Sequence, residues 1–499
     1  MRRAEKLFKL VLGSFFMASM FVNTGCSKEP VPNNGTDNNG ADSEETPSEV
    51  LNIRWESEVK EDTPLILFSG GKTSLVFKAE NAESISVKET PENWEINIDK
   101  ETSTVNVKAP LNGQNTSFDL ILSAKGKDGT EKEAKAKILY ITSFDDPKGA
   151  FVLNEGNMTT ENGSLTYITP DGFVIDDAYK AVNGTELGNV CQDMAFCNGK
   201  IYIISQNGDE NAVGTKFEND GMLVVVDAKT LKKEKSFSKE QLSQLYWPTH
   251  IAALDEKHIY IRDNKDNKGA IWRLDSETGE LTFIQGSNGA PQIPFTVKDG
   301  KVYTYINGTI AKLLSIDMKK DETTSVNLPF NLKDVFQIKN ADENNIWVLG
   351  NVSAVGNPNI IMKVNLEKPN DRTSPNRVLN TLPSPHGNAS GNRFVSYKNT
   401  IYYNDDTSIY SISFDEDNSE PKMLIDLNSL DKNAKELYNG LGINLSTGVL
   451  YVNTIKGVGP FYTTNSIWEF DVNSDWTTPK NKHDNYTNFP AGFFFADNN

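Results

Sequence analysis

The stretch "KIYIIS" at residues 200–205 is followed by "GMLVVVDAKT" at residues 221–230, and this pair of apolar strands recurs along the chain. The aromatic residue of the first strand, Tyr202, has counterparts in the later copies: Tyr260, Tyr303, Trp347, Tyr402 and Tyr451. The copies are about 50 residues apart, which is longer than most solenoid repeats and typical of β-propeller blades. Because packing requires such periodic recurrence, we expect these aromatic side chains in the core.

A third segment precedes each aromatic strand, as "YWPTHIAALDE" does at residues 246–256, and would line a central channel. The first unit lacks it, having only "AFVLNEGN" (150–157) and "GSLTYITPDG" (163–172). The tail "NFPAGFFFAD" (488–497) overlays on "YWPTHIAALD" and predicts the missing inner strand. The sequence therefore predicts an all-β fold, with a seven-bladed propeller over residues 146–499 closed by its C-terminal strand. Six or eight blades are the alternatives.

The chain begins with basic residues and an apolar run of about a dozen residues, too short to span a bilayer and typical of a secretory signal. The run ends at "NTGC", which resembles the cleavage site of bacterial lipoproteins. We expect a signal peptide over residues 1–25 and lipidation of Cys26; ordinary secretion with an incidental thiol is the alternative. Residues 26–50 are rich in Pro, Gly, Asn and acidic residues and predict a flexible tether.

Residues 51–145 contain short alternating stretches such as "TSLVFKAE" (73–80) and "FDLILSAKG" (118–126), separated by turn signals. This pattern predicts an immunoglobulin-like β-sandwich. Its expected role is a spacer between the membrane and the propeller.

Composition argues against several classes of function. The formal net charge of −18 disfavours nucleic-acid binding, which needs a field of Lys and Arg. The chain has four His residues and no zinc motif, so we expect no metal site and no cofactor. Cys191 and Cys197 are expected as buried thiols, with a disulfide or a metal site as alternatives. "DNKDNKG" (263–269) is a possible calcium loop, although it lacks the acidic residue of the EF-hand pattern.

The segments "GAFVLNEGNMTTENGSLTYITPDG" (149–172) and "AVNGTELGNVCQDMAFCNGKIYIISQNG" (181–208) resemble the YncE-like propeller lipoproteins of Bacteroidetes. That group includes the BtuG-type lipoproteins, which capture cobalamin at the cell surface and pass it to a TonB-dependent transporter. The resemblance implies ligand capture at the outer membrane, and it implies a corrinoid only weakly. Glycan binding, adhesion, or a lactonase- or lyase-like enzyme are the alternatives.

Ligands of propellers are commonly bound at the channel mouth, where loops vary on a rigid scaffold. Aromatic rings interleaved with amides suit a large flat ligand with a polar fringe, whether a corrinoid or a sugar chain. The alternatives are interblade packing for Tyr246 and Trp247, core packing for Phe336, and structural hydrogen bonding for the histidines. We expect no catalytic residues, and the candidate ligand-binding residues are Gln192, Asp193, Tyr246, Trp247, His250, Gln292, Phe336, His386, Asn388, Tyr438, Asn439, Phe461 and Tyr462.

Overall fold

A computed structural model describes residues 50–59, 64–264, 268–352, 356, 358–379, 381–383 and 391–496. The predicted signal peptide, Cys26 and nearly all of the predicted tether lie outside the described residues. His386, Asn388 and part of the 263–269 motif also lie outside them. Within the described residues, no helix has the length and apolar character needed to cross a membrane.

The segment from Asn52 to Ile141 forms two four-stranded sheets that enclose a common core, as expected for a β-sandwich. At the centre of that core, the ring of Trp94 packs edge-on against that of Tyr140, with centroids 5.3 Å apart. The first sheet has the order β1 (Asn52–Trp55), β3 (Lys72–Glu80), β6 (Thr104–Lys108) and β5 (Glu95–Asp99). The second has the order β2 (Leu65–Phe68), β8 (Glu131–Ile141), β7 (Thr116–Lys125) and β4 (Ser84–Val87), with β2 and β8 parallel.

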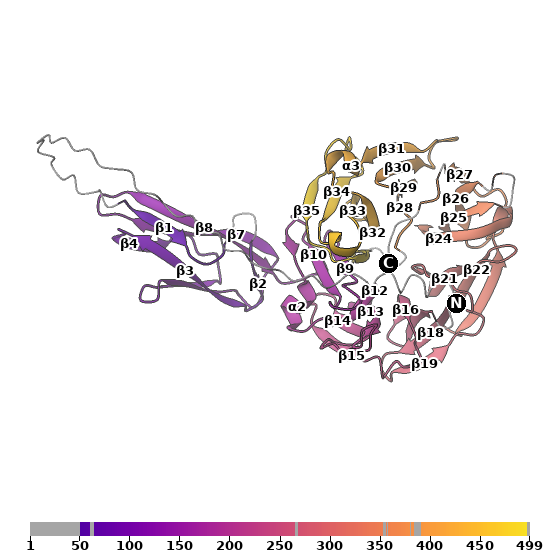
Figure 1. Cartoon of the computed structure of the whole chain (residues 1–499), viewed down its shortest axis with the longest axis horizontal. Helices are drawn as coiled ribbons and strands as arrows, with labels where there is room; N and C mark the ends of the chain where they lie inside the picture. Colours follow the sequence, from indigo (N-terminus) through magenta and orange to yellow (C-terminus); the bar gives the residue numbers. More distant parts are fainter. Residues whose placement is uncertain are drawn as a thin grey trace, which may run out of the picture. The chain divides into compact units, whose positions relative to one another are not determined.

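The described residues from Ala150 onward form seven more four-stranded antiparallel sheets, which Figure 1 shows around a common centre in a propeller-like arrangement. Their strands in spatial order are β36 (Pro490–Phe494), β9 (Ala150–Asn154), β10 (Ser164–Ile168), β11 (Val174–Ile175); β12 (Asn189–Cys197), β13 (Lys200–Gly208), β14 (Leu223–Asp227), β15 (Lys233–Phe237); β16 (Pro248–Asp255), β17 (His258–Asp263), β18 (Ala270–Asp275), β19 (Glu280–Phe283); β20 (Thr296–Lys298), β21 (Lys301–Ile306), β22 (Lys312–Asp317), β23 (Glu322–Asn327); β24 (Leu332–Asp342), β25 (Asn345–Val352), β26 (Asn359–Asn365), β27 (Asn376–Leu379); β28 (Phe394–Tyr397), β29 (Thr400–Asp405), β30 (Ser408–Ser413), β31 (Lys422–Asp426); β32 (Glu436–Asn444), β33 (Val449–Ile455), β34 (Asn465–Asp471), β35 (Asn481–Asp484).

In the part of the chain that the structure describes, the helices are short and lie in the connections between strands. Asp177 caps α2 (Ala178–Asn183) by accepting a hydrogen bond from the backbone of Lys180. Further helical elements among the described residues are α3 (Leu427–Leu430) and the 3₁₀ turns η2 (Pro329–Asn331) and η3 (Gly459–Phe461).

The C-terminal strand pairs with the first strand of this ring, as the sequence predicts. β36 runs antiparallel to β9, with Phe493 opposite Val152. The rings of Phe493 and Phe495 are 5 % and 4 % exposed, and both contact Tyr451 of β33. The apolar end of the chain is therefore covered on one side by β9 and on the other by the neighbouring sheet.

The recurrent aromatic residues are all buried, which confirms that they belong to the core. Polar side chains also join neighbouring inner strands. Thr296 of β20 donates to the carbonyl of Ile338 in β24. Gln337 of β24 accepts from the backbone N–H groups of Arg393 and Phe394 at the start of β28, at 2.7 and 3.2 Å. Buried polar groups of this kind need partners, so they fix how each inner strand sits beside the next.

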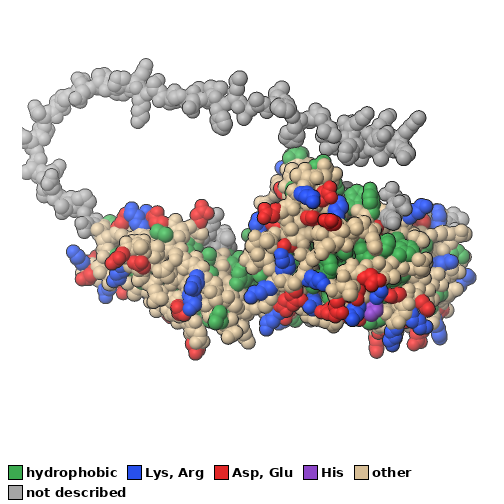
Figure 2. All heavy atoms as spheres, turned by 90° about the horizontal axis from the view of Figure 1, so that it is seen from below, with side chains coloured by type: hydrophobic (Ala, Val, Ile, Leu, Met, Phe, Trp, Pro, Cys, Tyr) green, Lys and Arg blue, Asp and Glu red, His purple; other side chains and the backbone are tan. Residues whose placement is uncertain are grey.

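Acidic and basic side chains are interspersed over the side of the molecule seen in Figure 2. The acidic excess is therefore not gathered into one patch on that side. Most of the ion pairs involve exposed residues, such as Lys257 with Glu277 at 3.0 Å, and pairs of this kind add little to stability.

Candidate functional site

The predicted ligand-binding residues that the structure describes lie on the side where the inner strands begin, which we call the start face. The opposite side, where the inner strands end, is called the end face. Five of the predicted side chains are buried: Gln192, Asp193, His250, Tyr438 and Asn439. The others are half-buried or exposed: Trp247, Gln292, Phe336 and Tyr462 are half-buried, and Tyr246 and Phe461 are exposed.

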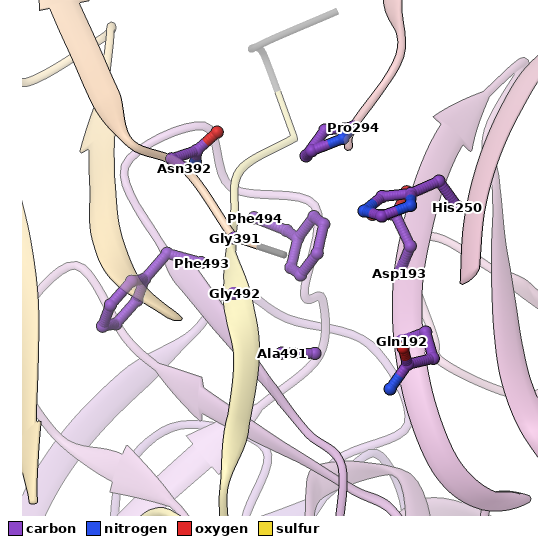
Figure 3. A pocket seen from close by; sticks show the side chains of 10 residues that line it. All are labelled: Gln192, Asp193, His250, Pro294, Gly391, Asn392, Ala491, Gly492, Phe493 and Phe494. Carbon is purple, nitrogen blue, oxygen red and sulfur yellow. The ribbon is translucent and has the colours of Figure 1, made fainter. Parts of the chain in front are cut away.

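A small cavity of about 30 Å³ lies in the channel near the start face. We call this cavity the neck. Figure 3 shows Gln192, Asp193 and His250 on one wall and β36 on the other. The ring of Phe494 points from β36 toward Asp193 and His250. A cavity of this size has room for about one water molecule.

Gln192 presents an unused hydrogen-bonding atom at the neck. The side chain is 2 % exposed, and its amide nitrogen donates to the carbonyl of Cys191 at 3.4 Å. Its Oε1 has no partner among the residues that the structure describes. An acceptor buried without a partner is costly, and a water or a ligand donor at the neck would satisfy it.

Asp193 joins two sheets through its carboxylate. One oxygen accepts from the backbone N–H of Met194 at 2.9 Å, and the other accepts from that of Ile251 in β16 at 3.0 Å. Burial raises the pKa of Asp193 to about 7, although these hydrogen bonds and the charge of Lys339 act in the opposite direction. The carboxyl group therefore titrates near neutral pH while holding β12 against β16.

This titration gives a testable pH dependence. The folded pKa of Asp193 lies above its unfolded value, so the folded chain retains a proton between about pH 4 and 7 that the unfolded chain loses. This group's contribution to the free energy of unfolding therefore falls as pH rises through that window. Asp193→Asn removes the titration, so its destabilisation relative to wild type should be larger at pH 5 than at pH 8, by roughly 2 kcal/mol. Urea unfolding at the two pH values checks this; an equal difference would contradict it.

His250 is 1 % exposed, and its Nδ1 lies 3.1 Å from the hydroxyl of Thr249. This contact agrees with the structural interpretation of the histidine. The same side chain also lines the neck, so it contributes polar surface to the channel mouth without being exposed on the face.

A second polar cluster surrounds Glu155 of the "LNEGN" motif. Glu155 is 2 % exposed and accepts from Asn439 at 3.1 Å and from the hydroxyl of Tyr438 at 3.4 Å. Asn439 also accepts from the backbone N–H of Gly391, which lines the neck. The ring of Phe489 stacks on that of Tyr462 at 4.2 Å and contacts that of Tyr438 at 5.1 Å. The cluster therefore connects the neck with an aromatic part of the start face.

Three neighbouring inner strands begin with strained backbone. Val190, Asn439 and Phe489 have φ values of 58°, 44° and 54°, in the left-handed region that glycine favours. A positive φ is most unfavourable for Val190, because its side chain is β-branched. Register shifts in β12 and β32 span Val190 and Asn439, and the shift in β36 follows Phe489, between Pro490 and Gly492. Bulges of this kind re-aim side chains, and strained backbone is concentrated at functional sites.

Two aromatic residues project from loops of the start face. Tyr246, in the β15–β16 connection, is 66 % exposed and lies edge-on to Trp247. Phe461, in the β33–β34 connection, is 53 % exposed with the ammonium of Lys456 over its ring. The ring of Tyr246 is therefore not packed between blades, which was the alternative interpretation of this residue. The core-packing interpretation does hold for Phe336, which packs against a buried cluster and lies beneath the guanidinium of Arg393.

Glu155, Phe489 and Arg393 were not among the predicted residues. Glu155 had a usable signal, because an acidic residue directly follows the apolar strand "AFVLN". No local sequence pattern indicates Phe489 or Arg393, because their partners come from other sheets.

Among the described residues, no three or more His, Cys, Asp or Glu side chains are grouped to hold a metal ion. Cys191 is buried and Cys197 half-buried, and both are free thiols. Burial raises the pKa of both thiols, which keeps them protonated.

The model of the family described as "Domain of unknown function (DUF5074)" matches residues 148–496. No curated protein matches the chain. Similar solved structures include a Lactobacillus plantarum protein (TM-score 0.39, 10 % identity, 70 % of this chain and 98 % of that chain). A Bacteroides thetaiotaomicron protein of unknown function is similar with a TM-score of 0.32 and 11 % identity, over 85 % of this chain and 84 % of that chain. A Vibrio parahaemolyticus oligogalacturonate lyase is similar with a TM-score of 0.38 and 10 % identity, over 73 % of this chain and 99 % of that chain. At these TM-scores none of them carries an argument about function.

Proposed function

The chain belongs to the family described as Domain of unknown function (DUF5074), and we propose that it is a lipid-anchored surface protein that captures a small ligand at the start face. In this proposal the seven sheets are the blades of a YncE-like propeller, and the N-terminal sandwich is an immunoglobulin-like spacer. Lipidated Cys26 anchors the chain to the outer membrane, facing the cell exterior. A TonB-dependent transporter receives the ligand.

The observation that carries the proposal is the pair of exposed rings on the start face. Tyr246 and Phe461 come from connections that are separated, around the ring, by the sheets containing β36 and β12. They therefore come from different parts of the start face. Exposed rings of this kind provide apolar contact area at low entropic cost.

Between these rings lie amide and carboxylate groups rather than an apolar floor. Gln192 has its unpartnered Oε1 at the neck, and Asn439 is held beside the neck by Glu155. A ligand with an apolar surface and a fringe of amide donors fits this arrangement, because rings cover the surface while amides exchange hydrogen bonds. A corrinoid carries such a fringe, and we propose a corrinoid such as cobalamin as the ligand.

The direct test is calorimetric titration of the mature chain, residues 26–499, with cyanocobalamin. We expect saturable heat at one ligand per chain and no chemical change in the ligand recovered afterwards. A folded chain that binds surface oligosaccharide but not cyanocobalamin would overturn the corrinoid assignment in favour of glycan capture. A chain that returns an altered ligand would overturn the assignment to a non-enzymatic binder.

A further inference from the structure

The channel opens at the end face into a cavity much larger than the neck. Its volume is about 920 Å³, and the second halves of the inner strands line it. Ligand pockets in proteins are typically about 300–1,000 Å³. It lies toward the end face, and it meets the neck at Asp193, Asn392, Phe493 and Phe494, which line both.

Lys339 of β24 is the unusual residue in this wall. The side chain is half-buried and lines the cavity, yet it forms no hydrogen bond or ion pair with any residue in the described part of the chain. Burial lowers the pKa of Lys339 to about 8, while the charge of Asp193 raises it. The ammonium group therefore faces the cavity without a partner among the described residues, where it can pair with an anion.

The acidic groups of the cavity are already engaged. Asp193 accepts two backbone hydrogen bonds, and Asp342 forms an ion pair with Lys363 at 2.5 Å. Two further lysines line the cavity: Lys298 donates to the carbonyl of Asp342, and Lys398 lies over the ring of Tyr397. Three lysines and two acidic residues therefore line the cavity, although the whole chain has a net charge of −18.

The rest of the wall combines polar and apolar groups, and its apolar part is continuous with the end of the chain. Phe295, Ala252 and Ile443 line it beside the aromatic end of the chain at Phe494 and Phe495. A cation without a partner, beside the apolar part of the wall, is complementary to a molecule with an apolar body and one negative group.

We propose that the end-face cavity is a second binding site, which takes a small carboxylate with an apolar body and holds the carboxylate on the ammonium of Lys339. This site goes beyond the proposed capture function, because it uses the opposite mouth of the channel and a ligand of different chemistry. An apolar ligand without a charge would leave Lys339 unpaired and should bind more weakly.

Calorimetry of the mature chain with 2-naphthoate and with octanoate tests this site. We expect saturable binding of at least one of them, and binding of 2-naphthoate about tenfold or more tighter than binding of the uncharged 2-naphthamide. Lys339→Met should lower the affinity for the carboxylate about tenfold or more, and Lys339→Arg should retain most of it. The matched control is Lys368→Met, which removes an exposed lysine from the connection after β26 and should change nothing.

Two further readouts separate a ligand site from a structural role. Lys339→Met should melt no lower than wild type, because it removes an unpaired cation. In a titration with cyanocobalamin, Lys339→Met should give the same result as wild type. Failure of both carboxylates to bind the folded chain, equal binding of carboxylate and amide, or a lower melting temperature of Lys339→Met would overturn the proposal.

Discussion

A chain that ends before Phe489 is expected to lose cooperative unfolding of the whole ring. The truncation removes β36, which pairs with β9 and covers Tyr451 through Phe493 and Phe495. Losing one buried Phe side chain costs about 3–5 kcal/mol, so losing two, together with a strand, is comparable to the total stability of a typical domain. Circular dichroism during thermal unfolding measures the effect.

Two variants make this result interpretable. Removal of residues 497–499 alone, which lie outside the described residues, should leave the melting temperature within a few degrees of wild type. Phe493→Ala should give a folded chain that melts lower, since it removes one ring and keeps the strand. A truncated chain that melts like the full one would show that β36 does not close the ring.

Gly442→Ala is expected to destabilise the ring at the same seam. A Cβ added at Gly442 of β32 would lie 2.3 Å from the Cβ of Phe493, an approach that real Cβ atoms essentially never show. Neither atom can move without shifting a strand, so we expect a loss of about 3 kcal/mol in the free energy of unfolding. Urea denaturation at pH 7 measures it.

The matched control is Gly308→Ala, because a Cβ there would meet only the carbonyl oxygen of Ile310, at 3.8 Å. That variant should change the free energy of unfolding by less than about 0.5 kcal/mol. Equal stability of the two alanine variants would show that β32 and β36 do not approach as closely as described.

The strands of the ring could be predicted because their signals are local. Each aromatic strand carries its own alternation, and the tail could be assigned to β36 by its likeness to "YWPTHIAALD". In the sandwich, β1 and β2 were not identified, since four residues such as "NIRW" and "LILF" provide little periodicity.

The site could be predicted only as a set of residues on one face. The contact between Glu155 and Asn439 joins residues 284 positions apart, and no pattern in one sequence indicates it. The sequence also did not predict that the Lys339 side chain faces the channel. β24 has register shifts, and these interrupt the alternation from which inward and outward side chains are assigned. His386 and Asn388 stay predictions.

The most direct test of ligand capture at the start face compares cyanocobalamin binding by three variants of the mature chain. Tyr246→Ala and Phe461→Ala each remove an exposed start-face ring, and each should weaken binding about tenfold without lowering the melting temperature. Met423→Ala removes a side chain that is 55 % exposed on the outer strand β31, and it should bind like wild type. Unchanged affinity in both aromatic variants, or an equal loss in all three, would contradict ligand capture at the start face.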